Sequence, residues 1–321
     1  MSHPPAATSL SSRLFDRLPD HVDRRVRVFA WLSFVAEVLI IATGGAVRLT
    51  GSGLGCPTWP TCTADSLVNT PEMGIHGVIE FGNRTLTGLV GILAVIVVVL
   101  VWRMRAERRD LFVLSLIVVG GVVAQAVVGG ITVLTGLNPF IVGFHYVASL
   151  ALVCVCAAFL VRMRAVPGPR TLAVPRWYAV TAHATTLALA LTIFFGVLTT
   201  GAGPHSGDAD AGRNGFNAEV LEHVHAWPGY VLFALVLLLT IVAWSRHLPT
   251  RAWITVLMGV VLVQIGVGLY QARNGLPELA VGVHMVLAAL AAATLTVVLL
   301  RLKTPAAADA VRAGELRTAH A

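Results

Sequence analysis

Long apolar stretches alternate with short polar breaks along most of the chain. Eight such stretches lie at residues 29–49, 78–102, 111–134, 140–162, 177–199, 217–245, 252–271 and 279–301. Each is close to the length of roughly 20 apolar residues that crosses a bilayer as a helix. In lipid the backbone must satisfy its own hydrogen bonds, so we expect every stretch to be an α-helix. The pattern predicts an all-α polytopic membrane protein.

The composition agrees with this prediction and excludes other classes of protein. The chain has 321 residues, of which 56% are hydrophobic and 12% are charged. A soluble domain carries about 25% charged residues. The composition therefore argues against an ordinary soluble enzyme, a disordered protein or a partner of nucleic acids, and its predicted surroundings are the lipid bilayer.

Basic residues are distributed unevenly among the predicted loops. Of the 23 Lys and Arg residues, 19 lie either before the first predicted span or in a segment that follows an even-numbered span. The tail after the eighth span is one of these segments. Loops rich in Lys and Arg stay on the cytoplasmic side, so we expect both termini to be cytoplasmic. The net charge of +7 then reflects topology and not an anionic partner. The four other basic residues are Arg48, Arg84, Arg213 and Arg273.

An internal repeat divides the chain into two halves. The stretch that begins at Gln125 matches the stretch that begins at Gln264, and this match aligns His145 with His284. A second match pairs LTGSG at 49–53 with TTGAG at 199–203. Because each unit has four spans, both have the same orientation, and a pseudo-two-fold axis along the membrane normal relates them. We therefore predict two tandem four-helix bundles.

The repeat sets the expected domain boundaries. The expected segments are a cytoplasmic N-terminal segment at 1–28, a first four-helix repeat at 29–164, a second four-helix repeat at 165–303, and a cytoplasmic tail at 304–321 that we expect to be disordered.

Several ionisable residues lie inside the spans, where they are costly and usually functional. His145 and His284 share one depth near the outer side, and Asn83 and His225 lie within reach of the same layer. A haem iron takes axial ligands from facing helices. His225 and His284 therefore predict a bis-histidine haem site in the second repeat. A hydrogen bond to a carbonyl is the alternative for each histidine, and His223 is a weaker alternative ligand.

The first repeat lacks the second histidine. Its second span carries His76, Glu80 and Asn83 at spacings that place them on one helix face, with Arg84 adjoining. Asn83 is a poor iron ligand, so we expect this half to hold a substrate group loosely or through His145 alone. Glu80 is either paired with a nearby arginine, Arg84 or Arg48, or poised for proton transfer. Glu37 in the first span is interpreted as a structural polar contact.

The two long outer loops differ in their side chains. The first contains Cys56 and Cys62, which face the oxidising side in the predicted topology, so we expect a disulfide. This bond would either exchange electrons or clip the loop. The second loop has no cysteine and offers Arg213, which with Arg48 is a candidate partner for a carboxylate such as a haem propionate. Solvated loop side chains are the alternative.

Taken together, these motifs resemble the haem A synthase family over about residues 30–301. The resemblance rests on GGAVRLTGSGLGCPTWPTC, on IEFGNR, on the HxxxA pattern from His284 (HxxxS from His145) and on the repeat. It implies a membrane oxidoreductase of the cell membrane that converts the C8 methyl group of haem O into a formyl group by successive hydroxylations. It also implies that haem b is the resident cofactor. The iron ligands would be His225 and His284 for haem b and His145 for the substrate haem, with Glu80 as the essential carboxylate.

The chain departs from the family pattern at two places. The usual ExxHR reads EFGNR here, so a histidine is replaced by Asn83, and His76, water or nothing takes its place. The second-loop cysteine pair of some members is absent. Haem O synthase or oxidase assembly proteins are candidate partners, and the sequence does not identify the electron donor. The main alternative function is an electron-transfer cytochrome b without its own substrate chemistry, and a transporter is a third class.

Overall fold

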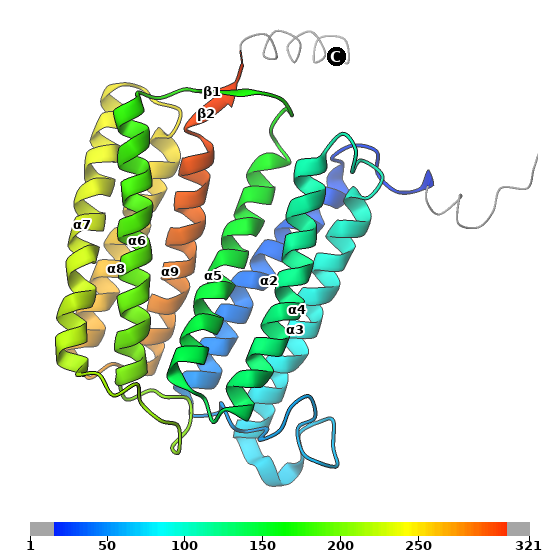
Figure 1. The fold of residues 1–321 in the computed structure, drawn as a ribbon, viewed down its shortest axis with the longest axis vertical. Helices are drawn as coiled ribbons and strands as arrows, with labels where there is room; N and C mark the ends of the chain where they lie inside the picture. The colour runs from blue at the N-terminus through cyan, green and yellow to red at the C-terminus, as the bar shows by residue number, and fades with distance from the viewer. Residues whose placement is uncertain (1–15, 307–321) are drawn as a thin grey trace, which may run out of the picture.

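The computed structural model describes residues 16–306, and eight long helices dominate this part of the chain. Each is long and apolar enough to cross a membrane, so the protein is a multi-pass membrane protein, as predicted. The helices are α2 (Arg24–Leu49), α3 (Gly74–Val101), α4 (Arg109–Leu134), α5 (Pro139–Arg162), α6 (Arg176–Ala202), α7 (Ala218–Ser245), α8 (Arg251–Arg273) and α9 (Glu278–Leu300). Figure 1 shows them running roughly parallel to one long axis.

The helix ends follow local capping more closely than the hydrophobic pattern. We predicted that the first helix begins at residue 29, but α2 begins at Arg24 because the Asp23 carboxylate accepts the Val26 N–H and caps it. Asn138 and Asn217 cap α5 and α7 in the same way. A single 3-10 turn, η1 (Pro71–Met73), leads into α3. Capping satisfies backbone N–H groups that a helix leaves unpaired at its start.

The helices form two groups that follow the chain order, with α2–α5 on one side and α6–α9 on the other in Figure 1. The groups meet mainly through α5 and α2 on one side and α9 on the other. Their shared core includes Ile41, Val153 and Ala289. The Tyr146 hydroxyl donates to the Met285 carbonyl at 2.8 Å, and these two residues align in the repeat. Contact between aligned residues is consistent with a pseudo-two-fold axis at this interface.

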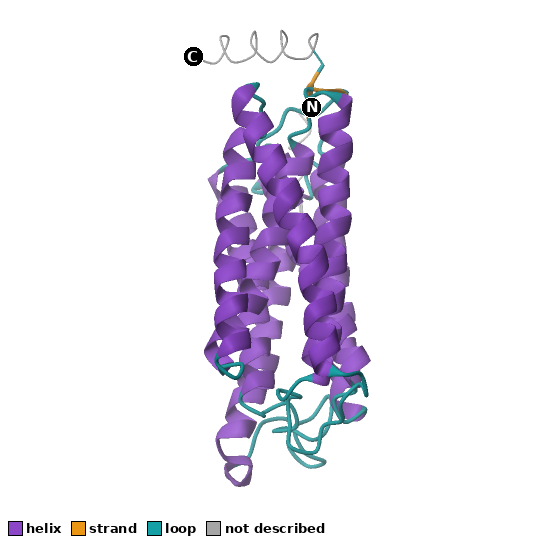
Figure 2. Cartoon of the chain, turned by 90° about the vertical axis from the view of Figure 1, so that its left-hand side faces the viewer, coloured by secondary structure: helices purple, strands orange, loops and turns teal. Residues whose placement is uncertain are grey.

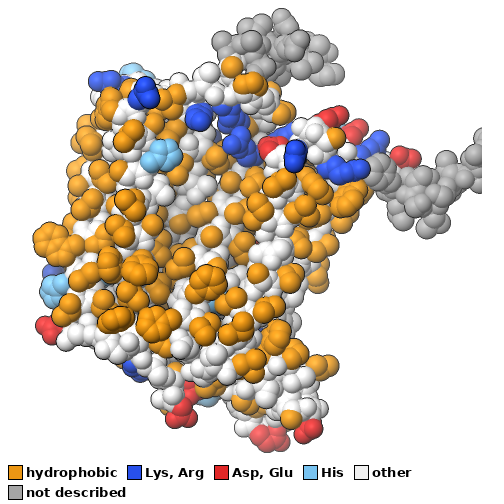
Figure 3. All heavy atoms as spheres, in the orientation of Figure 1, with side chains coloured by type: hydrophobic (Ala, Val, Ile, Leu, Met, Phe, Trp, Pro, Cys, Tyr) orange, Lys and Arg blue, Asp and Glu red, His pale blue; other side chains and the backbone are white. Residues whose placement is uncertain are grey.

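The two ends of the molecule differ in character. Figure 2 shows the longer loops gathered at one end, which we call the loop end; it carries residues 50–73 and 203–217. Most of the Lys and Arg side chains on the face in Figure 3 lie at the opposite end, which we call the arginine end. Hydrophobic side chains cover the flank between the ends. This distribution suits a chain whose middle contacts lipid.

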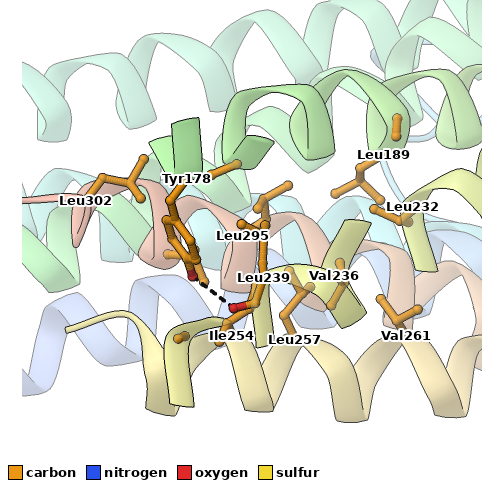
Figure 4. Close-up of a cluster of buried hydrophobic side chains, with 14 of the residues drawn as sticks. Tyr178, Leu189, Leu232, Val236, Leu239, Ile254, Leu257, Val261, Leu295 and Leu302 are labelled. Carbon is orange, nitrogen blue, oxygen red and sulfur yellow. Dashed lines mark hydrogen bonds between the residues drawn. The ribbon is translucent and has the colours of Figure 1, made fainter. Parts of the chain in front are cut away.

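The second helix group has a densely packed aliphatic core. Leu239, Ile254, Leu257 and Leu295 are almost completely buried around Tyr178 (Figure 4). The Tyr178 hydroxyl lies 3.4 Å from the Leu239 carbonyl and 2.8 Å from the Thr250 hydroxyl, so its polar atom is satisfied. This core packs the arginine-end half of α6–α9 together.

A short sheet changes the prediction for the tail. The strand β2 (Lys303–Pro305) pairs antiparallel with β1 (Arg170–Leu172), with Thr171 opposite Thr304. The expectation that disorder begins at residue 304 is therefore wrong for its first residues, because their backbone groups are paired with β1. The remainder of that tail and residues 1–15, with Arg13, Arg312 and Arg317 of the basic count, lie outside the described residues.

Candidate active site

His225 on α7 and His284 on α9 face each other near the loop end. Their ring centroids are 6.2 Å apart, and the ring planes are inclined by 72°. A metal–imidazole bond is about 2 Å long, so a metal bound between two rings separates their centroids by about 6 Å. The His225 Nδ1 lies 2.8 Å from the Thr192 carbonyl oxygen on α6. If Nδ1 donates that hydrogen bond, Nε2 presents its lone pair to a metal, as the histidine ligands of metals usually do.

Glycine lets these rings sit directly against neighbouring helices. A Cβ on Gly196 would lie 2.8 Å from His225 Cε1, closer than a real side chain approaches. A Cβ on Gly268 would lie 3.2 Å from His284 Cε1, and one on Gly129 would lie 3.4 Å from His145 Cε1. All three histidines are thus seated on backbone that carries no side chain. The donor set and spacing of His225 and His284 fit a six-coordinate haem.

The same glutamine contact supports His145 and His284 in the two halves. Gln125 Nε2 donates to the His145 carbonyl at 2.7 Å, and Gln264 Nε2 donates to the His284 carbonyl at 3.1 Å. Both glutamines reach across from the preceding helix, α4 or α8, and fix the backbone turn that carries the histidine. Sequence reasoning did not assign this role, although the repeat alignment of Gln125 with Gln264 contained the signal.

The rings of His145 and His284 share an unusual property. The Nδ1 atom of each is buried and has no hydrogen-bond partner among the described residues. A buried polar atom without a partner costs free energy, so such atoms are usually explained by a bound group. His145 therefore offers an imidazole that the protein itself does not fully satisfy.

Asn83, which replaces the family histidine on α3, is held by a neighbouring helix. The Thr43 hydroxyl on α2 donates to Asn83 Oδ1 at 2.7 Å. A Cβ on Gly44 would lie 4.0 Å from Asn83 Nδ2, so the amide packs beside α2. Sequence reasoning missed the contact with Thr43, because it depends on how α2 and α3 are rotated. The hydrogen bond occupies the amide oxygen and fixes the side chain.

Glu80 forms an ion pair with Arg84, one turn further along α3, and not with Arg48. The Glu80 side chain is 6% exposed, and Arg84 Nε donates to its Oε1 at 3.1 Å. The other oxygen, Oε2, accepts the Cys56 N–H at 2.6 Å. Arg84 also donates to the carbonyls of Cys56 and Thr58, each at 2.9 Å. The pair therefore ties the first outer loop to α3.

The predicted disulfide between Cys56 and Cys62 is confirmed, and both cysteines are buried. Trp59 of the same loop packs on α4: a Cβ on Gly130 would lie 2.4 Å from its ring. Cys154 and Cys156 are free thiols within α5. The loop is thus closed by the disulfide, anchored to α3 through Glu80 and seated on α4.

The remaining predicted residues lie around the loop end. His76 is exposed, and its Nδ1 lies 2.9 Å from the Ser52 hydroxyl. Arg48 donates to the carbonyls of His205 at 2.8 Å and Thr200 at 3.1 Å, so it joins the first half to the second outer loop. Arg213 is exposed and donates to two carbonyls of its own loop.

His223 points away from the histidine pair. It is exposed, and its Nδ1 lies 2.8 Å from the Glu219 carbonyl one turn earlier on α7. This contact ties the ring to its own helix, which agrees with its rank as the weaker ligand candidate.

A family model and individual known proteins that resemble this chain indicate the same family. A family model described as "Cytochrome oxidase assembly protein" matches residues 27–298. A protein of Lysinibacillus sphaericus named "Heme A synthase" is 33% identical over 144 residues, 44% of this chain and 45% of that protein. A protein of Halalkalibacterium halodurans with the same name is 28% identical over 124 residues, 38% of this chain and 41% of that protein.

The extent of these matches decides what they establish. The chain matches less than half the length of each of these relatives, whereas the family model extends from the first helix to the last. Because that model covers most of the chain, the protein belongs to the COX15-CtaA family of cytochrome oxidase assembly proteins.

Proposed function

We propose that the protein is a haem A synthase that oxidises the C8 methyl group of haem O to a formyl group by successive hydroxylations. The observation that carries this proposal is the facing pair His225 and His284, whose ring centroids are 6.2 Å apart. At the aligned positions the first half has Asn83 and His145, so it offers one histidine instead of two. Relatives named "Heme A synthase" support the same assignment. One half thus suits a permanently bound haem and the other a haem that must leave.

In this proposal the second half, residues 165–303, binds haem b as resident cofactor. His225 and His284 would be its axial ligands, and the Thr192 carbonyl would orient the His225 ring through Nδ1. When bound, this haem supplies one-electron transfer. Gln264 and Gly268 hold the His284 turn and seat its ring, so both imidazoles are preorganised.

The first half, residues 29–164, binds the substrate haem O through His145. A single axial bond, supported by Gln125 and Gly129, allows product to dissociate. Asn83, which Thr43 fixes, borders this site without ligating iron. His76 is exposed beside the first loop and contributes at the rim.

Glu80 handles protons at the substrate methyl group. Its Oε2 accepts one N–H and keeps a lone pair that can take a proton, while Arg84 holds Oε1 and stabilises the carboxylate. Arg84 therefore positions Glu80 and the disulfide loop above the substrate. Arg48 and Arg213 at the loop end are candidates for pairing with haem propionates, since a guanidinium carries five N–H donors.

The topology completes the proposal. Both termini are cytoplasmic and the loop end faces the outside of the cell membrane, because Lys and Arg concentrate at the other end. The substrate arrives from a membrane-embedded reaction that makes haem O, so a haem O synthase or an oxidase assembly protein is a fitting partner.

The test is haem extraction from cells that make haem O but cannot make haem A. Expression of this chain is expected to yield haem A, whereas the empty vector yields only haem O and haem b. Verified membrane insertion with haem b but no haem A would reject the synthase and favour the electron-transfer cytochrome.

A further inference from the structure

The second half contains a buried amide group that the proposed function does not use. Within the described part of the chain, the buried side-chain atoms without a hydrogen-bond partner are Glu37 Oε1, His145 Nδ1, Gln264 Oε1, Gln271 Oε1 and His284 Nδ1. The last three lie on α8 and α9, beside the histidine pair. His284 is a candidate iron ligand, and Gln264 supports the His284 carbonyl through Nε2. Gln271 has no role so far.

Gln271 lies on the face of α8 that meets His284. A helix turns by about 100° per residue, so Gln271 is rotated by about 20° from Gln264 and about 60° from Gly268. Gln264 Nε2 donates to the His284 carbonyl, and a Cβ on Gly268 would lie 3.2 Å from the His284 ring. Gln271 follows Gly268 by about 4.5 Å along the helix, toward the loop end. It therefore stands on the loop-end side of the contact between α8 and the His284 ring.

The aligned residue of the first half has a different environment. Thr132 aligns with Gln271 at the offset that aligns Gln125 with Gln264. Its hydroxyl donates to the Gly129 carbonyl at 2.6 Å, one turn earlier on its own helix. The shared scaffold is thus complete with a short side chain that bonds to its own backbone. The second half instead carries a longer amide, and an amide that is buried without partners costs free energy.

The chemistry of the haem identifies a partner for this amide. A haem carries two propionates on one edge, and a charged edge inside a membrane protein is most stable toward the water at the loop end. Arg48 and Arg213, the candidates named above, each donate to two backbone carbonyls. The Gln271 Oε1 atom has no such bond, so this amide is not held by the protein at that end. Hydrogen bonds to an ionised acceptor are about twice as strong as neutral ones.

We propose that Gln271 is a further binding residue of the second-half site, whose amide N–H donates to a propionate on the loop-end edge of the bound haem. This bond retains the haem and keeps its propionate edge toward the loop end. The proposal rests on the part of the proposed function that assigns a haem to His225 and His284. It does not depend on haem A synthesis, because an electron-transfer cytochrome with the same pair would use Gln271 in the same way.

Haem release from the purified full-length protein to excess apomyoglobin tests the retention. Gln271→Leu removes the donor at similar volume, so haem should transfer several-fold faster, while both axial ligands keep the low-spin spectrum unchanged. Gln271→Glu has the same length and places a carboxylate against the propionate, so transfer should be faster still. Thr132→Val, at the aligned buried position of the first half, is the matched control and should release haem b at the wild-type rate. Equal rates in the wild type and both Gln271 variants would overturn the proposal.

Resonance Raman spectra of the same haem-loaded proteins separate the proposed bond from a role in helix packing. The propionate bending band responds to hydrogen bonds at the carboxylate, so it should shift in Gln271→Leu and Gln271→Glu and stay in place in Thr132→Val. An unshifted band in Gln271→Leu would overturn the proposal even if haem release is faster. Wild-type protein without any haem would overturn it together with the cofactor assignment, whereas haem b without haem A would reject the synthase alone.

Discussion

The two halves of the molecule place different side chains on the same scaffold at the loop end. In the second half, His225 and His284 face each other at 6.2 Å. In the first half, the corresponding positions carry Asn83, bonded to Thr43, and His145, whose Nδ1 has no partner among the described residues. The glutamine and glycine that support the α5 and α9 histidines are the same in both.

This difference shows how two copies of one bundle can suit two different binding tasks. The glutamine and glycine contacts behind the α5 and α9 histidines are retained, whereas the groups that face these histidines differ. Two facing imidazoles suit a haem that stays, because both axial bonds must break before it leaves. One imidazole suits a haem that enters and leaves.

The outer loops of the two halves also differ in how they are held. Glu80 aligns with Glu222 in the second half, but Arg84 aligns with Ala226. Glu80 is buried against Arg84 and the Cys56 backbone, whereas Glu222 is exposed. The first half thus has an anchored, disulfide-closed loop above its site, and the second half has a loop without cysteine.

The largest expected effect is the loss of the resident haem. His225→Ala and His284→Ala each remove one of two axial bonds, so purified protein should lose the low-spin haem b spectrum. His223→Ala is the matched control, since the exposed His223 ring is hydrogen-bonded to its own helix, and the spectrum of this variant should equal that of the wild type. A bis-histidine spectrum in either of the first two variants would show that the ligands are wrongly assigned.

The second effect concerns Glu80. Glu80→Gln keeps the size of the side chain but removes its proton acceptor, and such groups contribute about 10²- to 10⁴-fold to rates. We expect haem A to fall by at least about 100-fold while haem b is normal and haem O accumulates. Glu222→Gln, at the aligned exposed position, should change neither haem. If Glu80 instead serves only to anchor the loop, Glu80→Gln will lower all haem content through poor folding.

The third effect concerns the disulfide. Replacing Cys56 and Cys62 with serine opens a short loop, which costs about 2 kcal/mol of stability. The first-half site lies beneath this loop, so we expect a lower unfolding temperature and less haem A, with haem b retained. Mass spectrometry of alkylated wild-type protein should show Cys154 and Cys156 as the modified cysteines. Modification of all four would refute the bond.

The smallest effect would come from making the halves more alike. Asn83→His gives the first half the ligand type of the second, so more substrate haem should remain bound through purification. Absorption spectra and haem-to-protein ratios measure this change. Thr43→Val, which only releases Asn83 from α2, should not raise the ratio. An unchanged ratio in Asn83→His would show that position 83 does not face the haem.

Most of the helical architecture could be predicted, because span length and apolar composition leave few alternatives in a bilayer. The start of α2 was missed because a cap at Asp23 extends it beyond the apolar run. Strand β2 was missed because Lys303–Pro305 has no apolar signal and depends on its partner strand.

The site was predictable only in part. The repeat and the hydrophobic pattern identified which histidines share a layer. They did not decide between Arg84 and Arg48 as the partner of Glu80, because both are near in sequence or depth. They also did not reveal the contact of Thr43 with Asn83. These features depend on how neighbouring helices are rotated, which the sequence pattern does not specify.

The central claim is that the two halves hold different haems, and the haem content of His145→Ala tests it most directly. The account predicts that wild-type protein, purified from cells that supply haem O, contains haem b together with haem O or haem A. His145→Ala should retain haem b with an unchanged spectrum and lose the other haems. Loss of haem b in His145→Ala with retention of haem O or haem A would contradict the assignment of the halves.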